Sequence, residues 1–288
     1  MNYLIDIFWI LVVLQFFVPF IRQRVVGMRR AAAIRLIETK NKSRVITMIH
    51  RQETISFLGL PIARYIDIED SERVLRAIHL TADDVPIQLI MHTPGGLVLA
   101  AEQIAQALSR RSGKVQVIVP HYAMSGGTLV AMAADEIVMD PNAVLGPVDP
   151  QLGGLNAAYP AASVLAALET PNANRSDETL ILGDIARKAI DQVHETVKAL
   201  LAKHVPEKNA EQLARMLSEG RWTHDYPISA DQAREMGLPV TENVPEEVYD
   251  LMELYPQSGQ RRPGVEFIPV PYRLPAAPPA APRGRGVR

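Results

Sequence analysis

The stretch "PIQLIMHTPGGLVLAAEQIAQALSRRSGKVQVIVPHYAMSGG", residues 86–127, decides the fold. It contains a short apolar strand, a glycine turn, a helix, a second apolar strand and a second glycine turn. The strands are near-continuous apolar runs, which is typical of strands covered by helices on both faces. Strands that alternate with helices indicate right-handed βαβ connections and a mostly parallel sheet. The sequence therefore predicts the α/β class.

The alternation continues on both sides of this stretch. Asp70 and Ser71 are candidate caps for a helix over 69–80, and Gly113 is expected to close the helix that starts at Leu97. Outside 86–127, the pattern predicts strands at 43–52 and 136–141, and helices at 69–80, 125–136, 177–204, 208–220 and 228–238.

Two glycine turns stand out because each follows a strand and opens a helix: "HTPGG" (92–96) and "MSGG" (124–127). In a parallel sheet both turns lie at the carboxyl ends of their strands, where open α/β sheets place their sites. Glycines let backbone N–H groups approach a ligand closely. We expect Gly95 or Gly96 to form an oxyanion hole with Gly126, beside Ser125 as nucleophile. The alternative is that the two glycine turns only permit tight connections between strand and helix and have no catalytic role.

A serine nucleophile needs a base. His92 could line the cleft, although a histidine at a strand end more often packs or hydrogen-bonds. Lysine also serves as a base when burial or a cationic neighbour lowers its pKa. Lys188, in "IARKAIDQV" (185–193), borders an apolar face and is the candidate. The alternative is a lysine whose stem covers apolar surface while its ammonium stays in water.

Composition excludes several classes of protein. The 288 residues are 48% hydrophobic with a net charge of −2, which is ordinary for a globular protein. Acidic and basic residues are nearly equal, so nothing indicates nucleic-acid binding. The chain has no cysteine, which removes disulfides, thiolate nucleophiles and cysteine zinc sites.

The two ends of the chain differ from the middle. The stretch "YLIDIFWILVVLQFFVPFI" (3–21) is close to the roughly 20 apolar residues that cross a bilayer as a helix. It predicts a single-pass membrane anchor over 1–22, and the arginines that follow predict a cytoplasmic body. Residues 23–43 read as a basic amphipathic helix at the membrane surface. Residues 256–288 are rich in proline and predict an extended or disordered tail, within which 267–272 could dock in a groove.

Four ordered motifs resemble those of a known family. The chain is similar to the signal-peptide peptidase A type membrane serine proteases (peptidase family S49) of the ClpP/crotonase superfamily, and within them to the serine dehydrogenase proteinases. The motifs are "HTPGG" (92–96), "AMSGGTLVAMAADEIVMDPNAVLGPVDPQ" (123–151), "ARKAIDQVHETVKALL" (186–201) and "EGRWTHDYPISADQAREMGL" (219–238).

The resemblance implies a fold and a site. It implies a ClpP/crotonase-like domain over 44–255, a parallel sheet of repeated ββα units with flanking helices. Ser125 would be the nucleophile, Gly96 and Gly126 the oxyanion donors, and Lys188 the base, because the spacing of Lys188 and Lys198 matches that of archaeal relatives. No metal or nucleotide cofactor is required, and relatives assemble as homo-oligomers.

The turn "DPQLGG" (149–154) departs from the ClpP pattern. It places Asp149 where ClpP proteases have their catalytic histidine, so the resemblance favours a Ser-Lys dyad over a Ser-His-Asp triad, with Asp149 structural. The expected function is a membrane-anchored serine endopeptidase that cleaves membrane-associated or unfolded polypeptides. The alternatives are a crotonase-like acyl-CoA enzyme and a catalytically inactive membrane scaffold.

Overall fold

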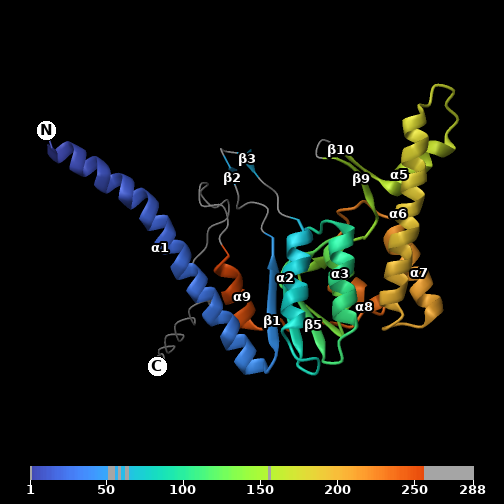
Figure 1. The fold of residues 1–288 in the computed structure, drawn as a ribbon. Helices are drawn as coiled ribbons and strands as arrows, with labels where there is room; N and C mark the ends of the chain where they lie inside the picture. Colours follow the sequence, from blue (N-terminus) through green and yellow to red (C-terminus); the bar gives the residue numbers. More distant parts are fainter. Residues whose placement is uncertain (1, 51–55, 58–59, 62–64, 155–156, 256–288) are drawn as a thin grey trace, which may run out of the picture.

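The computed structural model describes residues 2–50, 56–57, 60–61, 65–154 and 157–255 (Figure 1), and for most of residues 2–19 it describes the backbone alone. The helices of this part are α1 (Asn2–Asn41), α2 (Ile68–His79), α3 (Val98–Ser109), α4 (Gly126–Ala131), α5 (Ala161–Glu169), α6 (Asp177–Leu201), α7 (Glu207–Ser218), α8 (Ala230–Glu235) and α9 (Glu246–Glu253). The strands are β1 (Arg44–Ile49), β2 (Ser56–Phe57), β3 (Leu60–Pro61), β4 (Ile87–His92), β5 (Val115–Val119), β6 (Tyr122–Ala123), β7 (Glu136–Met139), β8 (Val144–Leu145), β9 (Gln151–Gly154), β10 (Ala157–Pro160), β11 (Ile228–Ser229) and β12 (Val240–Thr241).

The main sheet has the order β1-β4-β5-β7-β12, and every neighbouring pair in it is parallel. The predicted α/β class with a parallel sheet is therefore confirmed. A smaller sheet of order β11-β8-β6 lies at the carboxyl ends of β4 and β5, because the chain runs from β5 directly into β6 and Thr93 bridges to Ala123. This smaller sheet carries the turn that contains Ser125.

Helices cover both faces of the main sheet. Leu89 and Met91 of β4 pack into the larger core with α2, α3 and α4, whereas Ile90 between them packs into a second core with α1 and α9. Figure 1 shows the same division, with α1 and α9 on one side of the sheet and α2 and α3 on the other. Successive side chains of a strand point to opposite faces, so an apolar run without alternation is the pattern that two covered faces require.

Two predicted helix ends were wrong. The N-cap of α2 is Asp67, whose side chain accepts from the Asp70 N–H while the Asp70 side chain accepts from the Asp67 N–H. Asp70 is thus the third residue of a capping box instead of the cap itself. Helix α3 is capped at Arg110, and Gly113 instead allows the close approach of the backbone at Val85, since a Cβ on Gly113 would lie 2.8 Å from the Val85 carbonyl oxygen.

The predicted segments 1–22 and 23–43 form one continuous helix, α1, about 60 Å long at 1.5 Å per residue. Ala33, Ile34 and Ile37 pack against Val248 and Leu251 of α9 and its neighbours. The C-terminal part of the predicted 23–43 segment therefore packs inside the protein, because an amphipathic helix buries its apolar face against whichever apolar surface adjoins it. The membrane-surface role of the segment stays a prediction.

The N-terminal half of α1 projects from the body (Figure 1). Among the residues that the structure describes, we find no helix long and apolar enough to cross a membrane. The anchor predicted over 1–22 is not supported by this finding and stays a prediction. The proline-rich tail predicted over 256–288 lies outside the described residues.

Candidate active site

Ser125 lies on a sharp turn between β6 and α4. It is the N-cap of α4, with a φ of +51° and a ψ of −119°, a conformation that residues other than glycine rarely adopt. The turn is closed by a hydrogen bond from the Gly127 N–H to the Met124 carbonyl at 2.7 Å. Such backbone strain costs about 1–3 kcal/mol and persists only where the surroundings enforce it, often at functional sites.

The structure brings the two glycine turns together. The Thr93 N–H donates to the Tyr122 carbonyl at 3.1 Å, and the Met124 N–H donates to the Thr93 carbonyl at 2.9 Å. A Cβ built on Gly95 would lie 2.7 Å from the Cβ of Ser125, so a side chain there would collide with the serine. Gly95, with a φ of +102°, is therefore required both for its conformation and for the close approach of the turns.

Two of the three expected donors are free to bind a ligand. The Gly95 N–H donates to the hydroxyl of Thr93 at 3.2 Å. Within the described part of the chain, the N–H groups of Gly96 and Gly126 make no hydrogen bond. A Cβ built on Gly126 would be 3.5 Å from the Gly96 nitrogen, so the two amides adjoin. Unengaged N–H groups from two converging turns beside a strained serine have the arrangement of an oxyanion hole.

Lys188 lies on α6, and its side chain is 75% exposed. Its Nζ pairs with the Asp184 Oδ2 at 2.6 Å, one turn earlier on the same helix. The buried face of α6 contains Ala186 and Ile190, each two positions away and so about 200° around the helix. Lys188 therefore points away from the body of its own chain.

A second pair of residues gathers at the same end of the small sheet as Ser125. Asp149 is 2% exposed, and its Oδ1 lies 2.8 Å from Nδ1 of His224, 75 residues later in the chain. Gln151 donates to the other oxygen, Oδ2, at 2.7 Å. Asp149 follows β8, which pairs in parallel with β6, the strand that leads into Ser125. His224 precedes β11, which pairs antiparallel with β8, so it lies at the same end.

The His224–Asp149 pair was missed by the sequence analysis. The two residues are 75 positions apart in the sequence. The comparison with ClpP also concerned only a histidine at position 149, where this chain has an aspartate. His92, the other histidine considered, is 7% exposed and packs with the rings of His121 and Tyr122, at centroid distances of 5.5 and 4.2 Å.

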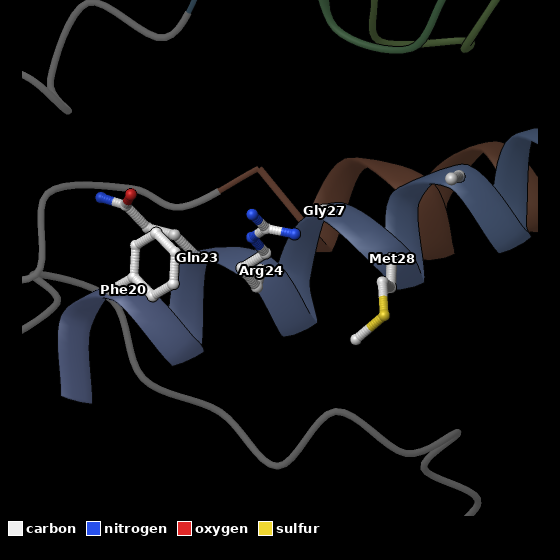
Figure 2. Close-up of a pocket in the computed structure, with 6 residues that line it drawn as sticks. Phe20, Gln23, Arg24, Gly27 and Met28 are labelled. Atoms are coloured by element: carbon white, nitrogen blue, oxygen red, sulfur yellow. The ribbon is translucent and has the colours of Figure 1, made fainter. Parts of the chain in front are cut away.

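A hollow of about 500 Å³ lies along the middle of α1 (Figure 2). The Arg24 guanidinium lies 5.3 Å from the centroid of the Phe20 ring at one end of it. The hollow is lined by Phe20, Gln23, Arg24, Gly27, Met28 and Ala31, all from α1, so it shares no residue with the two glycine turns.

The chain is similar in sequence to one family of proteinases and to two archaeal proteins. The family model described as "ClpP-like SDH-type serine proteinase" matches residues 1–280. The uncharacterized protein MJ1495 of Methanocaldococcus jannaschii is 53% identical over 265 residues, which cover 92% of this chain and 89% of that protein. A second protein of the same organism, MJ0137, is 54% identical over 268 residues, covering 93% and 92%.

Two solved structures are more distantly similar. A mutant of the 1510-N membrane-bound stomatin-specific protease has a TM-score of 0.45 and 18% identity, with 66% of this chain and 79% of that chain covered. ClpP1 from Listeria monocytogenes has a TM-score of 0.44 and 16% identity, with 73% and 97% covered.

Proposed function

The chain belongs to the ClpP-like SDH-type serine proteinases, and from this membership we propose that Ser125 is the nucleophile of its peptidase site. As a member of this family the protein is a serine-type peptidase, a hydrolase that acts on polypeptides. The family also disfavours the crotonase-like acyl-CoA enzyme, which would have no use for a serine at position 125.

The proposal rests chiefly on one observation: the N–H groups of Gly96 and Gly126, unengaged within the described part of the chain, adjoin each other next to Ser125. The Ser125 hydroxyl attacks the scissile carbonyl carbon, and its proton passes to a base. The carbonyl oxygen becomes an oxyanion that accepts from the Gly96 and Gly126 N–H groups. The protonated base then returns the proton to the leaving amine, and water hydrolyses the acyl-enzyme.

For the base we propose Lys188, acting on the Ser125 of a second copy of the chain. The Lys188 side chain points away from the body of its own chain. Ile181 and Ile185 lie on the same face of α6 and are 61% and 46% exposed. A contact between copies that buried this apolar stripe would also desolvate Lys188, and desolvation lowers the pKa of a lysine. The competing base is His224 of the same chain, oriented by Asp149.

We further propose that the N-terminal half of α1 attaches the protein to a membrane, with the peptidase body on the cytoplasmic side. Trp9, Phe17, Phe20 and Ile21 are each more than half exposed on the projecting helix. The basic residues that follow favour a cytoplasmic body. The substrates would then be membrane-associated or unfolded polypeptides. Vesicle flotation of the full chain, compared with a chain lacking residues 1–22, tests the attachment.

The test of the peptidase site is hydrolysis of a panel of fluorogenic peptides by the full chain. We expect Ser125→Ala to abolish hydrolysis while thermal unfolding stays close to wild type. Hydrolysis retained by folded Ser125→Ala contradicts the nucleophile, and a folded wild-type chain that cleaves no peptide supports the inactive scaffold.

The test of the base compares Lys188→Ala with His224→Ala, with Lys208→Ala as a control for loss of an exposed lysine. If Lys188 is the base, only Lys188→Ala loses activity. If it acts between copies, mixing Ser125→Ala with Lys188→Ala subunits restores part of the activity, because some mixed assemblies contain one intact site. Loss of activity in His224→Ala alone assigns the base to the His224–Asp149 pair.

A further inference from the structure

A series of contacts runs from Asp70 through the buried residues His50 and Thr93 to Gly95, the residue before Gly96. Asp70 Oδ2 is 3.1 Å from His50 Nε2, and His50 Nδ1 is 2.9 Å from the Thr93 hydroxyl. The Thr93 hydroxyl in turn accepts from the Gly95 N–H at 3.2 Å. His50 is 4% exposed and Thr93 is fully buried. Because Thr93 is fully buried, a substrate cannot reach its hydroxyl, so Asp70, His50 and Thr93 do not form a second nucleophilic site.

Thr93 connects the two glycine turns through its backbone, its methyl group and its hydroxyl. Its backbone N–H and carbonyl bond to the Tyr122 carbonyl and the Met124 N–H of the serine turn. Its methyl group packs against the start of α4, since a Cβ on Gly127 would lie 2.7 Å from Thr93 Cγ2. Its hydroxyl bonds to the Gly95 N–H of the other turn. A shift of Thr93 would therefore move both halves of the oxyanion hole.

The direction of the Gly96 N–H depends on how the Gly95–Gly96 peptide plane is held. The Gly95 carbonyl accepts from the Ile66 N–H at 2.7 Å, and the Leu97 N–H donates to the Ile66 carbonyl at 2.8 Å. In a trans peptide the N–H points opposite to the preceding carbonyl. With the Gly95 carbonyl directed at Ile66, the Gly96 N–H points away from Ile66. Gly95 is thus held at its carbonyl by Ile66 and at its N–H by Thr93.

The four groups are satisfied when the hydrogen bonds run in one direction. A neutral His50 with its proton on Nε2 donates to Asp70 and accepts from the Thr93 hydroxyl at Nδ1. The Thr93 oxygen then accepts from the Gly95 N–H. The alternative acceptor for the Thr93 proton, the Gly95 carbonyl, is farther away at 3.4 Å. In this tautomer His50 accepts the Thr93 proton at Nδ1 and so sets the direction of the Thr93 hydroxyl.

We propose that Asp70, His50 and Thr93 are positioning residues that fix the oxyanion turn, with the Gly96 N–H aimed at the reacting carbonyl oxygen. This inference rests on the proposed function, in which that N–H stabilises the oxyanion. None of the three residues contacts the substrate. They act by holding Gly95 in place. Gly95 has no side chain to restrict its backbone dihedral angles, so without these contacts the Gly95–Gly96 peptide plane could rotate.

The first test replaces Thr93 by valine, which keeps the shape and removes the hydroxyl. We expect kcat for a fluorogenic peptide to fall about 10- to 100-fold with KM within about threefold, because a misplaced oxyanion donor weakens only the transition state. Thr93→Ser keeps the hydroxyl and should restore most of the lost kcat. Ser218→Ala, which removes a fully buried hydroxyl from α7, is the control for the general loss of a buried hydrogen bond.

The second test uses the capping box of α2. Asp70→Ala and Asp67→Ala both break this box, but only Asp70 contacts His50. We expect a similar decrease in thermal stability for the two variants and a fall in kcat for Asp70→Ala alone. His50→Leu should lower kcat as Thr93→Val does.

The outcomes separate this inference from the proposed function. Wild-type activity that is lost in Ser125→Ala but unchanged in folded Thr93→Val and Asp70→Ala overturns the positioning role and leaves the peptidase site standing. Equal losses of kcat in Asp70→Ala and Asp67→Ala also overturn it, because the effect then follows the helix cap. Activity retained in Ser125→Ala overturns the proposed function itself.

Discussion

The substitution Gly96→Ala tests the geometry of the oxyanion hole most directly. Gly96 has a φ of +158°, and a Cβ on it would lie 2.2 Å from the Ile66 carbonyl oxygen and 2.4 Å from the Ile66 nitrogen. Both atoms belong to the backbone, so no side-chain rotation can relieve the collision. The turn at 93–97 and the segment at Ile66 must move apart.

The size of the effect follows from these distances. An ordinary contact needs at least 3.4 Å, so the 2.2 Å approach must open by about 1.2 Å. Displacements of about 1 Å at a reacting group cost roughly 10²-fold in rate, and loss of one oxyanion donor costs roughly 10²–10³-fold. The same movement strains the hydrogen bonds of Ile66 to Gly95 and Leu97, each of which contributes about 1 kcal/mol. We expect kcat to fall at least 10²-fold and stability to fall by about 2 kcal/mol.

The assay is peptide hydrolysis at a temperature well below the unfolding midpoint of the variant, with circular dichroism to establish that it is folded. Gly27→Ala is the matched control, since a Cβ there meets no atom within 4 Å. Gly27 lies inside α1, where alanine is expected to stabilise by about 0.5–1 kcal/mol without affecting kcat. A folded Gly96→Ala protein with kcat within threefold of wild type would refute the reasoning.

Three further predictions concern strain, charge and capping. Ser125→Gly should be more stable than Ser125→Ala by about 1 kcal/mol in urea unfolding, because glycine adopts a φ of +51° without strain; equal stabilities would show that the turn is not strained. Hydrogen bonds from Lys198 and then from Arg215, together with the charge of Lys198, lower the pKa of Glu211 to about 2. The stability contributed by Glu211 should thus be complete above its ordinary pKa of 4.5 and be lost as the pH falls from there to about 2, and Lys198→Met should weaken this acid dependence in urea unfolding. Ser229→Ala removes the cap of α8 and should lower the free energy of unfolding by about 1 kcal/mol; an unchanged value would mean that water replaces the cap.

The local sequence pattern was sufficient to predict the strands and helices around the site. The short apolar strand predicted at the start of the stretch 86–127 is β4, Ile87–His92, because a continuous apolar run between turns has few other ways to bury itself. The helix ends were less predictable. Asp67, Asp70 and Ser71 are all acceptable caps by residue type, and only the backbone conformation at Asp67 decides among them.

By itself, the sequence determined the parallel α/β class and the two glycine turns at the strand ends, because these depend on residues adjacent in the chain. The choice of Ser125 as nucleophile came from the order of the four family motifs and stays a prediction. The tertiary structure alone decided which groups meet: His50 with Thr93 43 residues later, Asp149 with His224, and Lys188 with solvent instead of its own site. Such contacts depend on strand order, on register and on which face of a helix is covered. No local pattern encodes these, since the same spacing of lysine and apolar residues serves a buried base and an exposed ion pair equally well.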